Sequence, residues 1–191
     1  MVNAAISNLV IMLVMMQVSK KIPFEDPTVL LLVRGAYILS NVLIFGLYFY
    51  TKSLIMKKND LTTMKYVEPS SPLSGSDESK LITTTIRDYD LQQVKTATKG
   101  VFTGIAMMGF MHLYMQYTNP LLMQSIMPLK SAFEQPIVQI HLFGKPSSGD
   151  LKRPFKAPSL FNAGGAGADA KTDKKAVAEA EKAGSGGAKE E

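Results

Sequence analysis

The sequence of 191 residues contains no cysteine and only two histidines, His112 and His141. Without cysteine, the chain forms no disulfide bond and offers no thiolate for metal binding or nucleophilic catalysis. The histidines have no plausible cluster of further ligands, and the chain lacks a Walker-type phosphate loop and the HExxH, GxSxG and Rossmann motifs. The sequence therefore predicts a protein that is not an enzyme and that carries no metal and no other cofactor.

Apolar residues make up 46% of the chain, and they are concentrated in long runs that polar, proline- and glycine-rich segments separate. The mean hydropathy is only +0.08 because residues 57–95 and 146–191 dilute these runs. The formal net charge of +5 lies outside the runs, as expected for a chain that contacts anionic membrane lipids or an anionic partner. This distribution predicts an all-α membrane protein with about three transmembrane helices rather than a single globular core.

Residues 1–18 are the first apolar run and are predicted to form a short N-terminal membrane helix. Lysines follow the run instead of preceding it, so we expect the segment to be retained and not cleaved as a signal peptide. A run of about 17 residues is at the short limit for a span, and an interfacial helix is the alternative. Asn8, like Asn3 and Ser7, would prefer a protein neighbour or water to lipid.

Residues 28–55 give the clearest membrane signal, with about 22 apolar residues that would form a helix of about 33 Å. The basic residues Lys52, Lys57 and Lys58 near its end place that end in the cytosol by the positive-inside rule. Arg34 is the exception within the run, because a central arginine costs about 2.5–3.5 kcal/mol on insertion scales. It is either an anchor that snorkels to the near surface or a cation that lines a wet cavity between helices.

Residues 56–95 form a polar segment that we expect in the cytosol. Pieces at 65–67 and 81–87 have strand-compatible sequences, and the stretch 70–79 between them is predicted to be a mobile tip because it is rich in serine, proline and glycine. The next helix is predicted to begin near Asp90, outside the bilayer.

Residues 96–118 are predicted to be the third membrane helix, because 100–117 carry no formal charge and no proline. Gly100 and Gly104 form a GxxxG pair that would let another helix backbone approach closely. A polar stripe and a methionine stripe would lie on neighbouring faces of this helix. The polar stripe is His112, Gln116 and Asn119, and the methionine stripe is Met107, Met111 and Met115.

Together with Arg34, these stripes predict a partly hydrophilic, methionine-rich groove in the membrane that binds client transmembrane segments. Methionine adapts to varied apolar partners, and the polar side chains supply hydrogen bonds. Taken singly, each stripe has a simpler explanation, since methionine also fills gaps in helix packing and polar side chains also join neighbouring helices.

Residues 119–143 are predicted to be a Pro-broken helix, because two prolines interrupt the apolar pattern and the continuation carries Lys130 and Glu134. Broken backbone at membrane depth is tolerated only beside protein or a water-filled cavity. The segment is therefore either a re-entrant half-helix or an amphipathic helix at the interface.

Residues 144–161 form a basic segment, and residues 162–191 are predicted to be a disordered tail because they have too little apolar surface to fold. Composition does not separate RNA, lipid headgroups and a partner protein as the target of the basic residues. The basic contacts are assigned to Lys57, Lys58, Lys152, Arg153 and Lys156.

Several blocks of the sequence resemble one family. They are KNDLTTMKYVEP (58–69), TTTIRDYDL (83–91), TGIAMMGFMHLY (103–114), YTNPLLMQSI (117–126), HLFGKP (141–146) and GDLKRPFKAPSLF (149–161). In this order they look like the fungal inorganic phosphate transport protein family of the endoplasmic reticulum, also known as the third component of the SRP-independent (SND) targeting pathway. The resemblance covers nearly the whole chain, although the first 55 residues agree more in pattern than in identity.

This resemblance implies a multipass protein of the endoplasmic reticulum membrane that acts in SRP-independent targeting and insertion of client membrane proteins. The partners it implies are the Sec translocon, the translating ribosome and other SND pathway components. The older family name implies phosphate transport or the maturation of a phosphate permease, and a structural translocon subunit that binds no client is a third alternative. A phosphate pathway should bring several cations together within the membrane, whereas this chain offers only Arg34 there.

Overall fold

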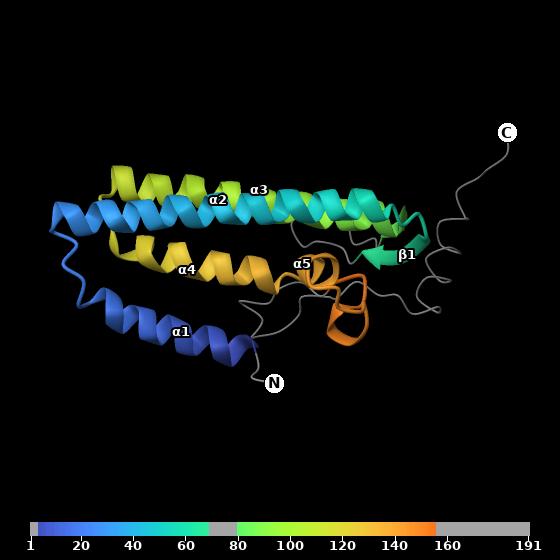
Figure 1. Cartoon of the computed structure of the whole chain (residues 1–191), viewed down its shortest axis with the longest axis horizontal. Helices are drawn as coiled ribbons and strands as arrows, with labels where there is room; N and C mark the ends of the chain where they lie inside the picture. Colours follow the sequence, from blue (N-terminus) through green and yellow to red (C-terminus); the bar gives the residue numbers. More distant parts are fainter. Residues whose placement is uncertain (1–3, 69–79, 156–191) are drawn as a thin grey trace.

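A computed structural model describes residues 4–68 and 80–155, which form a bundle of helices with a two-stranded hairpin at one end (Figure 1). The longer helices are α1 (Ala4–Ser19), α2 (Pro27–Lys58), α3 (Ile86–Gly109) and α4 (Asn119–Glu134). The hairpin strands are β1 (Thr63–Glu68) and β2 (Lys80–Thr85). The shorter elements are the π-helical turn η1 (Phe110–Tyr114), the helix α5 (Pro136–His141) and the 3-10 turn η2 (Gly149–Leu151).

Helix α2 forms over the clearest apolar run and has a defined cap at each end. The Asp26 carboxylate accepts a hydrogen bond from the Thr28 amide at 2.8 Å, and Pro27 occupies the first turn, where its missing N–H costs nothing. Asn59 ends the helix in the left-handed conformation. In the part of the chain that the structure describes, α2 is the one helix long and apolar enough to cross a membrane, whereas Ile6–Ser19 forms a shorter apolar helix.

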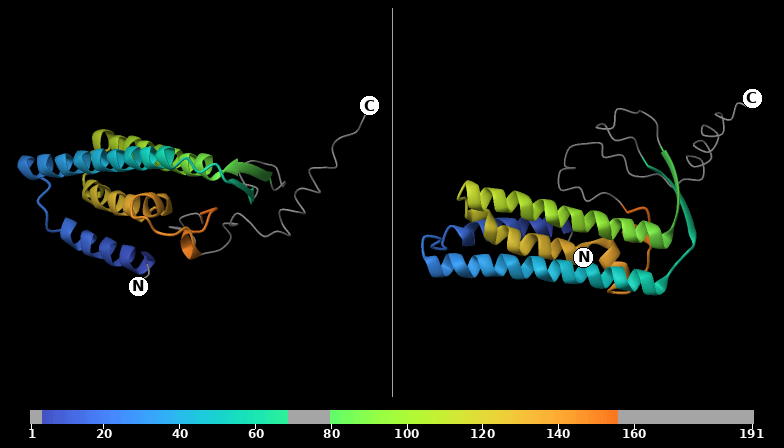
Figure 2. Two further views of the ribbon diagram at one scale, coloured as in Figure 1. Left: turned by 45° about the vertical axis from the view of Figure 1, so that its right-hand side comes forward. Right: turned by 90° about the horizontal axis from the view of Figure 1, so that it is seen from above.

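The helices alternate in direction along the bundle. Figures 1 and 2 show α2 and α3 side by side, α4 lying along both of them, and α1 beyond α4. One core cluster joins α2 to α4 and α5 near the hairpin, with Ile44, Ile55 and Val138 almost fully buried. A second cluster at the opposite end joins Val33 of α2 to Met108 of α3 and Leu121 of α4, and the packing of α4 on α2 is thus continuous along the bundle.

The polar segment after α2 contains two strands, which overlap the strand-compatible pieces 65–67 and 81–87, and the structure pairs them in an antiparallel hairpin. Thr63 pairs with Thr85 and Glu68 with Lys80, so the described chain contains a small sheet and is not purely α-helical. Helix α3 begins at Ile86 and not near Asp90, because the Thr85 hydroxyl accepts from the Asp88 amide at 3.1 Å and caps the helix earlier.

The predicted breaks in the later helices are partly misplaced. Pro128 lies inside α4, which continues through it, and the break falls at Gln135 before Pro136. The third apolar helix ends in η1, and Gln116 has a left-handed backbone with φ of 54°. His112, Gln116 and Asn119 therefore do not share one helix face, which corrects that prediction. The predicted mobile tip and disordered tail lie outside the described residues.

Candidate functional site

The structure joins two of the predicted groove residues, Arg34 of α2 and His112 of η1. The Arg34 Nε donates a hydrogen bond to His112 Nε2 at 2.9 Å. An accepting Nε2 places the proton of the neutral ring on Nδ1, which is buried and has no hydrogen-bond partner among the described residues. The π-helical turn that carries His112 is a geometry found often at functional sites. This pair puts a guanidinium on the surface of an otherwise apolar part of the bundle.

The predicted methionine stripe lies next to this pair, on α3 and the chain that follows it. Met107 is 66% exposed and Met115 is 61% exposed, while Met111 is half-buried. The side chains of Met107 and Met115 are therefore largely free of packing contacts with the described residues. Gln116 and Asn119 are also exposed, but both lie beyond the end of η1. Gln116 lies in the connection to α4, and Asn119 is the first residue of α4.

The GxxxG pair on α3 does not bring two backbones together within the described chain. A Cβ atom placed on Gly100 or Gly104 would meet no atom within 4 Å. The prediction of close helix packing at these glycines is thus wrong for the contacts inside this part of the protein.

A second polar group lies between α4 and α1. Lys130 Nζ donates hydrogen bonds to the side-chain oxygen of Asn8 and to the carboxylate of Glu134, which is one turn further along α4. The expectation that Asn8 would find a protein neighbour is confirmed. Sequence analysis noted all three residues but had no means to connect them, since Asn8 and Lys130 are 122 positions apart.

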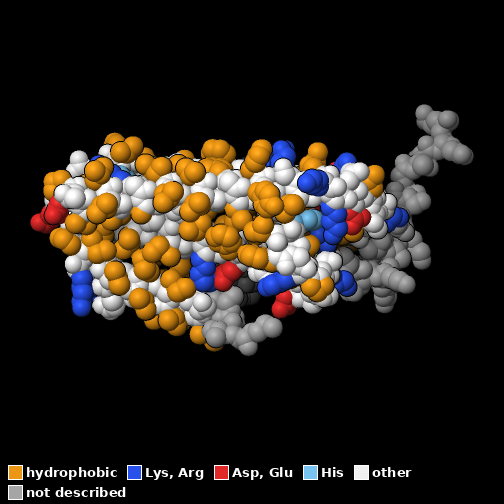
Figure 3. All heavy atoms as spheres, viewed as in Figure 1, with side chains coloured by type: hydrophobic (Ala, Val, Ile, Leu, Met, Phe, Trp, Pro, Cys, Tyr) orange, Lys and Arg blue, Asp and Glu red, His pale blue; other side chains and the backbone are white. Residues whose placement is uncertain are grey.

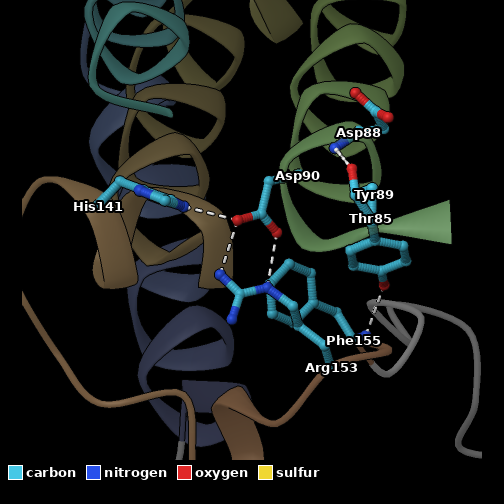
Figure 4. Close-up of polar contacts among 7 residues, drawn as sticks. All are labelled: Thr85, Asp88, Tyr89, Asp90, His141, Arg153 and Phe155. Carbon is cyan, nitrogen blue, oxygen red and sulfur yellow. Dashed lines mark hydrogen bonds and ion pairs between the residues drawn. The ribbon is translucent and has the colours of Figure 1, made fainter. Parts of the chain in front are cut away.

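A third polar group, which sequence analysis missed, is a buried ion cluster at the hairpin end of the bundle (Figure 4). Arg153 donates two hydrogen bonds to the Asp90 carboxylate, from Nε at 2.6 Å and from Nη2 at 2.7 Å. His141 Nε2 lies 2.7 Å from the same carboxylate. The side chains of these three residues, which we call the Asp90 cluster, are 1–8% exposed.

Tyr89 extends the Asp90 cluster towards the chain that follows α5. Its hydroxyl accepts the backbone N–H of Phe155 at 2.7 Å, and its ring lies between the rings of Tyr66 and Phe155. Burial raises the pKa of Tyr89 to about 12, so the phenol stays neutral at physiological pH. Together with Arg153, these contacts fasten residues 149–155 to the first turn of α3. Arg153 is thus buried in the protein and does not belong to an exposed basic surface.

The other predicted basic contacts remain at the surface where the structure describes them. Lys57 and Lys58 are exposed at the end of α2, and Lys152 is exposed beside the Asp90 cluster. Lys156 lies outside the described residues. No group of three or more histidine or acidic side chains that could hold a metal ion occurs within 4–68 and 80–155.

The fold and these polar groups define a helical protein with one membrane-length apolar helix and polar contacts between its helices. The sequence model of the family described as phosphate transport (Pho88) matches residues 2–188. SRP-independent targeting protein 3 of Saccharomyces cerevisiae is 57% identical over 190 residues, which cover 99% of this chain and 100% of that protein. The chain belongs to the Pho88 family, as its sequence blocks predicted.

Two proteins of Schizosaccharomyces pombe are also similar. One is an uncharacterized protein, 45% identical over 163 residues that cover 85% of this chain and 81% of that protein. The other is the SRP-independent targeting protein 3 homolog, 42% identical over 179 residues that cover 94% of this chain and 91% of that protein. No solved structure matches the chain.

Proposed function

We propose that this protein acts in SRP-independent targeting of client membrane proteins to the endoplasmic reticulum and in their insertion there. The names of the relatives from Saccharomyces cerevisiae and Schizosaccharomyces pombe support the targeting role. The observation that carries the insertion role is the hydrogen-bonded pair of Arg34 and His112 on an apolar part of the bundle. An arginine guanidinium at membrane depth is costly, so its presence there supports a polar function within the membrane.

In this proposal α1, α2 and α3 cross the membrane and α4 lies beside them within it. Hydrophobic side chains cover much of the face in Figure 3, and charged side chains lie at its left end and towards its right, with one basic and acidic pair in the lower middle; the broad apolar area supports this placement. Lys57 and Lys58 put the hairpin end of α2 in the cytosol by the positive-inside rule. The Asp90 cluster then lies in the cytosol, and Arg34 lies in the luminal half of the membrane.

The mechanism is non-enzymatic and lowers the cost of moving a polar group of the client into lipid. A polar group without a hydrogen-bond partner in an apolar medium costs several kcal/mol, and about 2–7 kcal/mol is typical. Arg34, held at Nε by His112, offers its other guanidinium N–H groups to the client, and the exposed Met107 and Met115 hold the client's apolar face. Methionine suits this role because its unbranched side chain repacks against different sequences.

The proposed partners are the Sec translocon, the translating ribosome, other SND pathway components, client transmembrane segments and membrane lipids. The exposed Lys57, Lys58 and Lys152 at the cytosolic end provide a basic surface for the ribosome, for the translocon or for anionic headgroups.

Site-specific photocrosslinking tests this function in membranes that carry stalled nascent membrane proteins. A photoreactive residue is placed at Met107 on the proposed groove, and separately at Leu43 of α2, which is 51% exposed and serves as the matched lipid-facing control. Client crosslinks from Met107 that exceed those from Leu43 support insertion. Capture of translocon subunits alone would instead support a structural role, in which the methionines pack against those subunits.

Phosphate transport is the alternative that the family description raises. Purified protein in liposomes would then move phosphate, and Arg34→Ala would abolish the flux. Among the described residues, Arg34 is the cation that hydrogen-bonds to His112, and a single cation at this site is a poor basis for an anion path. We therefore expect no flux above that of empty liposomes.

A further inference from the structure

Helix α1 packs chiefly against α4 and touches it along a narrow stripe. None of the residues from Ile6 to Ser19 is fully buried. Asn8, Ile11 and Met15 are half-buried at helical spacing, whereas the rest of the helix is largely exposed. Figures 1 and 2 show α1 at the edge of the bundle, separated from α2 and α3 by α4. A helix held on one side only is easier to displace than a helix of the core.

The contact that identifies this face of α4 is the hydrogen bond from Lys130 to Asn8. Lys130 also pairs with Glu134, so the two charges cancel and α4 presents an N–H donor to α1. Lys130 lies 11 residues after the start of α4, about 17 Å along the helix, and its side chain is 22% exposed. A donor in apolar surroundings needs an acceptor, and Asn8 provides one.

We propose that the face of α4 covered by α1 is a client-binding site, and that α1 occupies it when no client is present. The inference rests on the proposed function and adds the class of client: an apolar transmembrane segment with a hydrogen-bond acceptor, namely Asn, Gln, Asp or Glu, opposite Lys130. Helix α1 shows what fits there, because it is a short apolar helix whose Asn8 meets that donor.

The connection between α1 and α2 allows this exchange. The loop 20–26 joins the two helices, and Phe24 packs against the cluster that contains Val33 and Leu121. The loop therefore stays fixed to the bundle while α1 swings away from α4. The acceptor of the client then replaces Asn8 at Lys130, so neither the donor on α4 nor the acceptor of the client is left unpaired, while Asn8 is released with α1.

Two model clients that differ only by Asn or Leu at the centre of their apolar segment test the recognition. The wild-type protein, with a photoreactive residue at Ile126 of α4, should capture the Asn client about tenfold more than the Leu client, the preference that one hydrogen bond to a charged donor gives. Lys130→Met should abolish this preference and Lys130→Arg should keep it. The double variant Lys130→Met, Glu134→Gln removes both charges and reports the same loss if Lys130→Met fails to accumulate. A preference for the Asn client that persists in Lys130→Met or in the double variant would overturn the assignment of Lys130.

The competition by α1 is tested from the other side of the contact. Asn8→Leu removes the acceptor of α1, so capture of the Asn client should rise by up to about tenfold. Because the natural chain has no cysteine, the pair Ile11→Cys, Met127→Cys can lock α1 to α4 with a short bismaleimide. In the crosslinked fraction, capture should fall to the level of empty membranes, while the same pair without reagent captures normally. Unchanged capture in the locked protein would show that α1 does not cover the site.

These outcomes are distinguishable from failure of the proposed function. If clients crosslink to Met107 but ignore the changes at Asn8 and Lys130, the protein handles clients and this site is wrong. If clients crosslink to none of the positions on α3 and α4 above the Leu43 control, the client-handling function itself is wrong.

Discussion

Replacing Asp90 with alanine should release residues 149–155 from the base of α3. The Asp90 carboxylate lies within hydrogen-bond distance of His141 and accepts two hydrogen bonds from Arg153, and its side chain is 1% exposed. Removing one partner of a buried ion pair costs about 3–5 kcal/mol, because the other charge is left buried and unpaired. Arg153 lies after the last α-helix described, so its segment can move into water and avoid that cost. We therefore expect local release rather than unfolding of the bundle.

Hydrogen exchange in detergent, resolved to peptides, measures this release. A loss of about 3 kcal/mol lowers the exchange protection of residues 149–155 by about 100-fold. Protection within α2 should change far less. Arg153→Met should give the same pattern from the other side of the contact. Asp88→Ala is the matched control, because Asp88 is an exposed carboxylate two positions away that pairs with Arg87. If Asp90→Ala and Asp88→Ala exchange alike, the Asp90 cluster does not hold this segment.

Three further changes have defined outcomes for unfolding followed by circular dichroism. Leu121→Ala should destabilise the bundle by about 2–5 kcal/mol because Leu121 is 2% exposed. Leu113→Ala is the control and should cost far less, because Leu113 is 78% exposed. Equal losses of stability would contradict the assignment of Leu121 to the core. Ser40→Ala should leave the free energy of unfolding unchanged or raise it by up to about 1 kcal/mol, because the buried Ser40 hydroxyl has no hydrogen-bond partner among the described residues. A clear loss of stability would show that the hydroxyl has a partner. The stability advantage of wild type over Tyr89→Phe should shrink as pH rises from 10 towards 12. The Tyr89 phenol has a pKa of 10.0 when unfolded and about 12 when folded, so the unfolded state ionises first. A difference that stays constant with pH would show that Tyr89 is not buried in solution.

The sequence by itself determined which stretches become helices and strands. Long apolar runs predicted helices over 1–18, 28–55 and 96–118; α2 covers the second run, α1 covers the described part of the first, and α3 covers the third as far as Gly109. Strand-compatible sequences indicated strands at 65–67 and 81–87, and β1 and β2 cover most of these residues. These features follow from local patterns, because periodicity, caps and turn residues act over a few positions. The family could also be read from the sequence, since its blocks occur in order along nearly the whole chain.

Local patterns misplaced several boundaries and faces for identifiable reasons. Pro128 looked like a helix break, yet α4 continues through it to Glu134: the packing of its buried residues, such as Leu121 and Ala132, holds the helix despite the lost hydrogen bond and the ring clash of an interior proline. The stripe of His112, Gln116 and Asn119 assumed an unbroken helix. No proline or glycine within 110–118 marks the π-helical turn or the left-handed Gln116 that end the helix there.

Only the tertiary structure decided which polar residues meet. Asp90 contacts His141 and Arg153 from 51 and 63 positions away, and Lys130 contacts Asn8 from 122 positions away. Sequence analysis could state that each such residue needs a partner in apolar surroundings, because an unpaired polar group there is costly. It could not name the partner, since helix packing brings together positions that no local period relates. The need for pairing is thus a property of the sequence, and the choice of pairs is a property of the fold.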